Sequence, residues 1–243
     1  MNKLIHGTWQ EELPKIESES VDLIIIDPPY IVTKEKWDKE EVVNSKLSFE
    51  LFRIAKQNCS IYIWCGIGEK SQSLIRWFPI FNKDWYFKDL ITWKKQRGIG
   101  MRKGWLYTRE EILWFVKDNK KFIWNKKNQY SEEKSQYTGK GVSENGKLTN
   151  QFGKERLSEY KRISNVWIDI HEKSTSIKTI HFTPKPKKAI ERIILAHTKK
   201  NDTVLDCFLG SGTTMEVCNN LNRFCIGIEK ELEYYEYCKQ FIE

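Results

Sequence analysis

The residues with the clearest chemical use are the four of Asp27-Pro28-Pro29-Tyr30. The exocyclic amine of adenine or cytosine is a weak nucleophile, because its lone pair is delocalised into the aromatic ring. A carboxylate and a neighbouring proline carbonyl can accept the two hydrogens of such an amine, which localises the lone pair on nitrogen for attack. A tyrosine ring beside them can stack on a base that has left the duplex. The alternative is a turn that only ends a strand, because Asp and Pro are both frequent in turns.

The run from Val21 to Ile26 predicts the strand that positions this motif. Its apolar, mostly β-branched residues are typical of a strand buried on both faces of a parallel sheet. Two prolines end such a strand, because neither can donate a hydrogen bond to a neighbouring strand. We therefore expect Asp27 and Tyr30 at the carboxyl edge of the sheet, where open α/β sheets bind their ligands.

A second pattern of this kind begins at residue 203, where a predicted strand over 203–206 leads through a glycine turn into a predicted helix over 213–221. Glu229 ends the next predicted strand, 23 residues after Asp206, where an acidic side chain can accept hydrogen bonds from ribose hydroxyls. A dinucleotide-binding turn needs a third glycine, which this turn lacks. A nucleoside cofactor without a pyrophosphate fits better, and S-adenosylmethionine is one that also carries a cationic methyl donor.

Composition favours a single domain with a polyanionic partner. The chain has 243 residues, 41 of them Lys or Arg and 33 Asp or Glu, and its formal net charge is +8. This length allows one core with an insertion, and the basic balance favours a polyanionic partner. A basic protein without such a partner is the alternative.

We expect neither a metal site nor a membrane segment. The six cysteines form no Cys-x-x-Cys pair and the four histidines are dispersed, so the thiols are expected to be reduced. The sequence has no apolar window of about 18 residues and no signal-peptide core at its amino terminus, which predicts a cytoplasmic protein that does not contact a membrane.

Helices and strands alternate along the remaining sequence, a pattern typical of an α/β fold with a parallel sheet. The segment 33–44 has no periodicity and is expected to form a mobile loop beside the site, with an ordinary surface loop as the alternative. Further strands are predicted over 3–6, 60–64, 85–93, 111–116, 122–124 and 166–168, and helices over 48–57, 66–77, 189–197 and from 229 onward.

Two segments are expected to recognise the substrate. Between Asp89 and Glu110 the sequence has no acidic residue, and its basic residues and glycines predict a flexible loop along a phosphate backbone, with a solvated face as the alternative. Residues 126–176 are largely polar and predict a target-recognition insertion, with plain disorder as the alternative. The insertion separates a catalytic part, 1–125, from a cofactor-binding part, 177–243, of the same domain. The expected contacts to nucleic acid are Lys94, Lys95, Arg97, Arg102 and Lys103.

With both motifs present, the chain resembles the amino DNA methyltransferases of the β class, in which the catalytic motif precedes the cofactor motif and the target-recognition region lies between them. The resemblance covers nearly the whole chain. It rests on Asp27 to Tyr30, Leu205 to Thr214, Gly227 to Glu229 and His181 to Pro186.

The chain departs from the family pattern at three places. Cys207 stands where the family usually has proline, and the segment from His181 to Pro186 reads His-Phe-Thr-Pro-Lys-Pro instead of His-Pro-Thr-Gln-Lys-Pro. Thr8 follows Gly7 where the family often has an aspartate that contacts the adenine of the cofactor.

The resemblance implies a Rossmann-like methyltransferase fold, with a mostly parallel seven-stranded sheet, one antiparallel strand and helices on both faces. It also implies S-adenosylmethionine as cofactor, duplex DNA as substrate, and in many members a homodimer or a cognate restriction endonuclease of a restriction-modification pair. The implied catalytic residues are Asp27, Pro28, Pro29 and Tyr30, and the implied cofactor residues are Thr183, Lys185, Asp206, Phe208, Gly210, Ser211, Gly212, Thr213, Thr214 and Glu229.

Within this family an aspartate before Pro-Pro-Tyr accompanies adenine more often than cytosine, so we expect methylation of adenine N6 by base flipping. Three alternatives stay open: a cytosine-N4 methyltransferase, an RNA or protein-amide methyltransferase, and a DNA-binding module without catalysis. The chemistry of Asp27 serves the amine of either base equally well.

Overall fold

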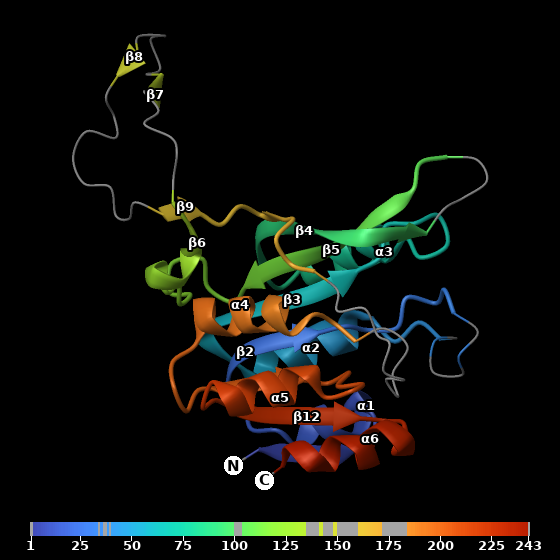
Figure 1. Ribbon diagram of the computed structural model, residues 1–243. Coiled ribbons are helices and arrows are strands. Elements are labelled where there is room, and N and C mark those ends of the chain that lie inside the picture. Colours follow the sequence, from blue (N-terminus) through green and yellow to red (C-terminus); the bar gives the residue numbers. More distant parts are fainter. Residues whose placement is uncertain are drawn as a thin grey trace.

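Figure 1 shows the computed structural model of the chain, which describes residues 2–33, 35, 38, 40–99, 104–134, 141–142, 148–149, 160–171 and 184–242. Within these residues the main sheet has eight strands, and all neighbours are parallel except at β5, which runs antiparallel to β3 and β4. In spatial order they are β1 (Lys3–His6), β12 (Phe224–Glu229), β11 (Thr203–Asp206), β2 (Val21–Ile26), β3 (Ala55–Cys65), β5 (Tyr107–Val116), β4 (Tyr86–Ile99) and β10 (Val166–Trp167).

The predicted α/β sheet with one antiparallel strand is therefore confirmed. The strand count of seven was one too low, because the two-residue strand β10 pairs with the outer edge of β4. β2 is a central strand whose six residues are all buried. Ile24 and Ile26 belong to one hydrophobic core and Leu23 and Ile25 to the other, as expected of a strand covered on both faces.

Each core contains the helices of one face. The helices α1, α2 and α3 cover one side of the sheet, and α4, α5 and α6 cover the side that faces the viewer in Figure 1. Their bounds are α1 (Trp9–Glu12), α2 (Ser45–Ile54), α3 (Ser73–Phe81), α4 (Lys187–His197), α5 (Thr213–Asn220) and α6 (Leu232–Cys238), with short 3-10 helices η1 (Leu13–Lys15) and η4 (Lys239–Phe241).

The pairing of β2 with β11 determines where the two sequence motifs meet. These strands are far apart in the sequence but are parallel neighbours, with Leu23 opposite Val204 and Ile24 opposite Leu205. β12 pairs in parallel with the other edge of β11. Because parallel strands end at the same edge of a sheet, the residues that follow β2, β11 and β12 emerge side by side.

Several predicted boundaries differ from the structure. The expected helix over 48–57 occupies Ser45–Ile54, because the side chain of Asn44 caps its first turn by accepting a hydrogen bond from the backbone N–H of Leu47, 3.1 Å away. The expected helix over 66–77 begins only at Ser73, whose hydroxyl bonds to both backbone groups of Gly66 and closes a turn before the helix.

The predicted strand over 122–124 is wrong, because these residues are irregular and their rings pack on β5. The rings of Phe122 and Trp124 lie 5.9 and 5.3 Å from the ring of Trp114. The apolar composition of this segment is therefore used for packing and not for strand pairing.

Between Lys126 and Arg162 the described residues form small elements outside the main sheet, visible at the upper left of Figure 1. The 3-10 helix η3 (Lys126–Gln129) leads into β6 (Tyr130–Lys134), which pairs with β9 (Tyr160–Arg162), and β7 (Gly141–Val142) pairs with β8 (Leu148–Thr149). The role of residues 126–176 in target recognition stays a prediction. In the described part of the chain, no helix has the length and apolar character needed to span a membrane.

Candidate active site

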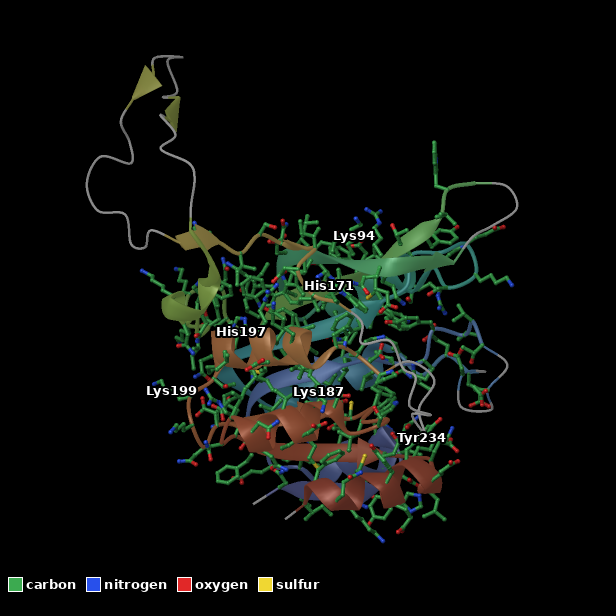
Figure 2. All side chains as sticks on the ribbon, in the orientation of Figure 1. Lys94, His171, Lys187, His197, Lys199 and Tyr234 are labelled. Carbon is green, nitrogen blue, oxygen red and sulfur yellow. The ribbon has the colours of Figure 1, made fainter. Side chains whose placement is uncertain are left out.

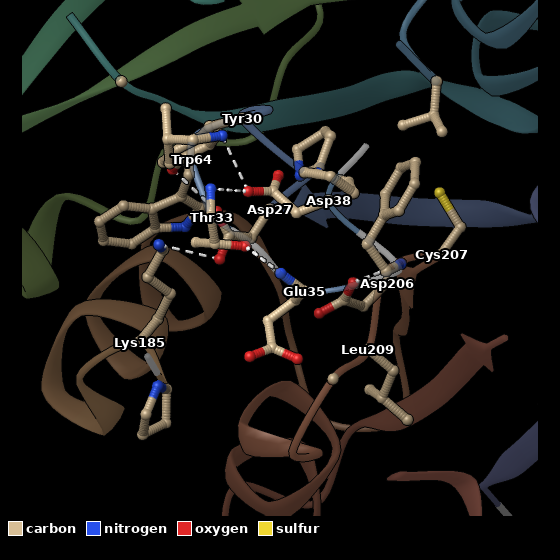
Figure 3. A pocket seen from close by; sticks show the side chains of 18 of the residues that line it. Asp27, Tyr30, Thr33, Glu35, Asp38, Trp64, Lys185, Asp206, Cys207 and Leu209 are labelled. Atoms are coloured by element: carbon tan, nitrogen blue, oxygen red, sulfur yellow. Dashed lines mark hydrogen bonds and ion pairs between the residues drawn. The ribbon is translucent and has the colours of Figure 1, made fainter. Parts of the chain in front are cut away.

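A cavity of about 920 Å³ lies at the edge of the sheet where β2, β11 and β12 end. Figure 3 shows Asp27 and Asp206 within this one pocket, each at the end of its own strand. Among the described residues that line it, nine are acidic and five are basic, although the whole chain is basic. An acidic cavity in a basic protein favours a cationic ligand. The predicted site residues on its wall are Asp27, Pro28, Pro29, Tyr30, Lys95, Lys185, Asp206, Phe208, Gly210, Ser211, Thr213, Thr214 and Glu229.

Asp27 is held by partners on both of its carboxylate oxygens. The hydroxyl of Tyr30 donates to Oδ1 at 2.8 Å, and the ammonium of Lys185 lies 2.8 Å from Oδ2. Burial raises the pKa of the Tyr30 phenol, and the negative charge of Asp27 raises it further. Tyr30 therefore stays protonated and can keep donating to Asp27.

The turn after the motif is held by a carboxylate that the sequence analysis did not identify. Asp38 is buried and accepts hydrogen bonds from the backbone N–H groups of Ile31, Val32 and Thr33, at 2.6, 2.8 and 2.6 Å. Ile31 has φ of +62°, a left-handed conformation that is strained for a β-branched residue. Asp38, from the expected loop over 33–44, is thus hydrogen-bonded to the turn after the motif.

Two buried carboxylates organise the opposite side of the cavity. Asp206 accepts hydrogen bonds from the hydroxyl of Thr214 at 2.6 Å and from the backbone N–H of Phe208 at 3.0 Å. Burial raises the pKa of Asp206 to about 7, although these two hydrogen bonds oppose the shift. Glu229 accepts from the backbone N–H groups of Gly210 and Glu231 at 2.6 and 2.7 Å, and burial raises its pKa as well.

The glycines of the turn have separate tasks. Gly210 and Gly212 have φ of +55° and +79°, which glycine adopts without strain. A Cβ on Gly212 would lie 2.8 Å from Cys238 and from the ring of Phe241, so this glycine lets the turn pack against the last helices. Ser211 on one side of it lines the cavity.

Three of the five predicted nucleic-acid residues lie on a strand where a loop was expected. Lys94, Lys95 and Arg97 belong to β4, because Lys94 pairs with Arg109 and Ile99 with Tyr107 across the ladder to β5. Lys94 is exposed, whereas Lys95 forms an ion pair with Glu110 at 2.7 Å. Figure 2 labels Lys94 at this outer part of the sheet. The side chain of Arg97 and the whole of Arg102, Lys103 and Thr183 lie outside the described residues.

Lys185 was expected at the methionine end of the cofactor, and that contact stays a prediction. Its contacts in the structure are with Asp27 and with Glu110, whose Oε2 lies 3.1 Å from the lysine nitrogen. Sequence reasoning missed Glu110, although this residue is the first acid after the basic stretch. Its proximity to Lys185 follows only from the folding of β5 beside β3.

The described part of the chain contains no group of three or more His, Cys, Asp or Glu residues that could hold a metal ion. All six cysteines are buried and unpaired. Separately, the described wall of the cavity offers carboxylates, hydroxyls, backbone groups, aromatic rings and basic side chains for holding ligands. These groups suit an organic cofactor with a cationic centre and hydroxyl groups.

Comparison with known proteins gives the family. Residues 21–240 match the family described as DNA methylase. The chain is 33% identical over 258 residues to the Type II methyltransferase M1.MboII of Moraxella bovis, covering 96% of this chain and 94% of that protein. It is 30% identical over 249 residues to the DNA adenine methyltransferase YhdJ of Escherichia coli (strain K12), covering 95% of this chain and 79% of that protein.

Among solved structures, the crystal structure of the M1.HpyAVI–SAM complex superposes with a TM-score of 0.66 at 25% identity, and the match covers all of both chains. The chain belongs to the DNA methylase family. It is an S-adenosylmethionine-dependent DNA methyltransferase with a Rossmann-like fold.

Proposed function

We propose that this enzyme methylates the N6 amine of adenine in duplex DNA, and that it does so on a base turned out of the helix. The observation that carries the proposal is that Asp27 and Asp206 lie at the carboxyl ends of neighbouring parallel strands and line one cavity. A cavity of about 920 Å³ has room for a nucleoside cofactor and a base together.

In the proposed mechanism Asp27 and the carbonyl of Pro28 accept the two hydrogens of the amine, so that the nitrogen lone pair points at the donor. The new bond forms between this nitrogen and the methyl carbon as the bond from carbon to sulfur breaks, and the sulfur keeps the electron pair. The nitrogen then loses one proton, which passes to solvent water. S-adenosylmethionine supplies a methyl group that is already activated, so orientation by Asp27, Pro28 and Tyr30 should provide much of the acceleration.

On the cofactor side we propose roles for the predicted residues of the glycine turn. Glu229 is proposed to accept hydrogen bonds from the ribose hydroxyls, since each of its oxygens has one backbone donor and a remaining lone pair. Asp206 is proposed to stabilise the positive charge of the amino acid end. Phe208, Ser211 and Thr213 line the same space.

Adenine is proposed over cytosine because a relative that covers most of the chain is named as an adenine methyltransferase. The carboxylate of Asp27 can accept a hydrogen from either amine, so a cytosine-N4 activity is the second candidate. The Type II names among the relatives support a place in a restriction-modification pair with a cognate endonuclease. A homodimer is the arrangement that the family resemblance favours.

The hairpin of β4 and β5 is proposed as a DNA contact. Its stem contributes Lys95, Tyr107 and Arg109 to the cavity wall, and Lys94 is exposed beside them. Trp105 is 93% exposed near the tip, which is unusual for a tryptophan in the absence of a partner. A basic hairpin with an exposed indole can contact phosphates and stack on a base at the mouth of the cavity.

The test is to incubate duplex DNA with the enzyme and S-adenosylmethionine and to identify the modified nucleoside by mass spectrometry. We expect N6-methyladenine, with the context of the modified base read by long-read sequencing. Asp27→Ala should lower the rate by about 10²-fold or more while the cofactor still binds. N4-methylcytosine would overturn the choice of base, and an Asp27→Ala enzyme with normal turnover would overturn the proposed catalytic site.

A further inference from the structure

Lys185 is a buried cation at the acceptor side of the cavity. Its side chain is 10% exposed, and its ammonium lies 2.8 Å from Oδ2 of Asp27 and 3.1 Å from Oε2 of Glu110. It also lies over two aromatic rings, 5.3 Å from the centre of Tyr30 and 5.2 Å from that of Trp64. Every one of these contacts belongs to the catalytic motif or to the strands β3 and β5 beside it.

Opposite charges stabilise the buried ammonium of Lys185 beside Asp27 and Glu110. Burying an ammonium is costly unless opposite charges compensate it. Burial alone would lower the pKa of Lys185, but Asp27 and Glu110 outweigh that effect and raise it above its usual value. Burial likewise opposes ionisation of Glu110, but Lys185 and Lys95 together lower its pKa. The lysine is therefore charged, and it is held by two carboxylates.

The contacts also fix the direction of the Asp27 carboxylate. Oδ1 receives the hydroxyl of Tyr30 while Oδ2 receives Lys185, so neither oxygen can rotate without losing a charged or buried partner. Glu110 is in turn held by Lys95 at 2.7 Å. Figure 3 shows Lys185 and Trp64 on the Asp27 side of the pocket, with Asp206, Cys207 and Leu209 on the other side.

We propose that Lys185 is a positioning residue of the acceptor site: anchored by Glu110, it orients Asp27 toward the target amine, and it is not a ligand of S-adenosylmethionine. This rests on the proposed catalytic role of Asp27. Loss of Lys185 should therefore lower the rate of methyl transfer and leave cofactor affinity as it was. Loss of a cofactor ligand would instead lower cofactor affinity.

The experiment compares Lys185→Met with Lys187→Met. Lys187 is two residues further along, outside the cavity, and pairs with Glu216 on α5; Figure 2 labels it between α4 and α5. Cofactor affinity is measured by calorimetry and the transfer rate by single-turnover incorporation of labelled methyl at saturating cofactor and DNA. For Lys185→Met we expect a rate lower by about 10²-fold and a cofactor dissociation constant within about 3-fold of wild type. Lys187→Met should match wild type in both.

Two further variants guard against a folding defect. Glu110→Gln removes the anchor and keeps the lysine, so the rate should fall while cofactor affinity holds. Lys185→Arg keeps the charge and should recover part of the rate. Melting temperature is recorded for each variant.

A dissociation constant raised about 10-fold or more in Lys185→Met, with the saturated rate unchanged, would overturn the proposal and make Lys185 a cofactor ligand. An unchanged rate in folded Glu110→Gln would overturn the anchoring role. Cofactor affinity is measured without turnover, so it tests Lys185 even in a preparation that methylates neither base. Failure of the proposed function would instead appear as a wild-type enzyme that modifies no DNA.

Discussion

At the scale of single residues, the site is organised by carboxylates that are themselves fixed. Asp38 holds the strained backbone after the catalytic motif, and Glu229 holds the glycine turn. Asp206 differs from them because its pKa of about 7 leaves it near half protonated at neutral pH in the unliganded enzyme. Burial is the main cause of this raised pKa, and we expect it to make cofactor binding sensitive to pH.

We predict that affinity for S-adenosylmethionine rises with pH through about 7. A cationic ligand stabilises the ionised form of Asp206, so binding below pH 7 must first release a proton and should weaken by up to about tenfold per pH unit. Calorimetry between pH 5.5 and 8.5 measures this, with Asp206→Asn as a control that binds weakly but with less dependence on pH. An equally flat profile for the wild type would contradict the prediction.

The same shift has a defined sign for stability. The pKa of Asp206 rises from 3.8 to about 7 on folding, so the folded enzyme holds a proton that the unfolded chain has released. Between these two values the contribution of Asp206 to the free energy of unfolding falls as pH rises. Bound cofactor should offset this loss, because it favours the ionised carboxylate.

At the scale of elements, the β4–β5 hairpin shows that local sequence alone did not predict how far strand β4 extends. Lysines, arginines and glycines between 94 and 104 have no strand pattern of their own, and a loop was the expectation. Pairing with β5 overrides that local preference as far as Ile99, because a partner strand supplies hydrogen bonds whatever the side chains are. The segment over 122–124 differs in the opposite direction, since it has strand composition but packs its rings on Trp114 and forms no strand.

We predict that Trp105→Ala weakens binding to duplex DNA by about 5-fold or more, because a stacked base contributes about 1–3 kcal/mol. The slope of affinity against salt concentration should stay the same, since no phosphate contact is lost. Fluorescence anisotropy at several salt concentrations measures both. Phe49→Ala is the matched control, because Phe49 is 60% exposed on α2 and does not line the cavity. Equal affinity for wild type and Trp105→Ala would remove the indole from the proposed DNA surface.

At the scale of the whole molecule, the sequence was sufficient for the α/β class, the central strand and both ends of the cavity. The aspartate of each motif could be identified because Asp27 directly follows a buried strand and Asp206 is the last residue of one. The contacts of Lys185, Glu110 and Asp38 could not, since they depend on which strands become neighbours. Sequence spacing says little about the order of strands in the sheet. In this sheet β5 lies beside β3, and this places Glu110 next to Lys185 and the motif.

We predict that the thiols report on global opening of the fold. All six cysteines are buried and unpaired, and burial raises the pKa of Cys59, Cys65, Cys207 and Cys238. Because the thiolate is the reactive form, a disulfide reagent at pH 7.5 should modify the native enzyme slowly and all six cysteines promptly in denaturant. Absorbance of the released thiolate counts them. A rapid reaction of one or more thiols in the native enzyme would contradict the burial described.

The register of the parallel pairing between β2 and β11 also sets the distance between Asp27 and Asp206. A strand advances by about 3.3 Å per residue, and a shift of one residue in the pairing also turns each side chain to the opposite face. One residue added within β2 would thus displace Asp27 relative to Asp206 by about 3.3 Å. That is about the distance between the reacting atoms in a productive complex. We therefore expect an insertion or deletion inside the six residues that precede Asp27 to abolish methyl transfer.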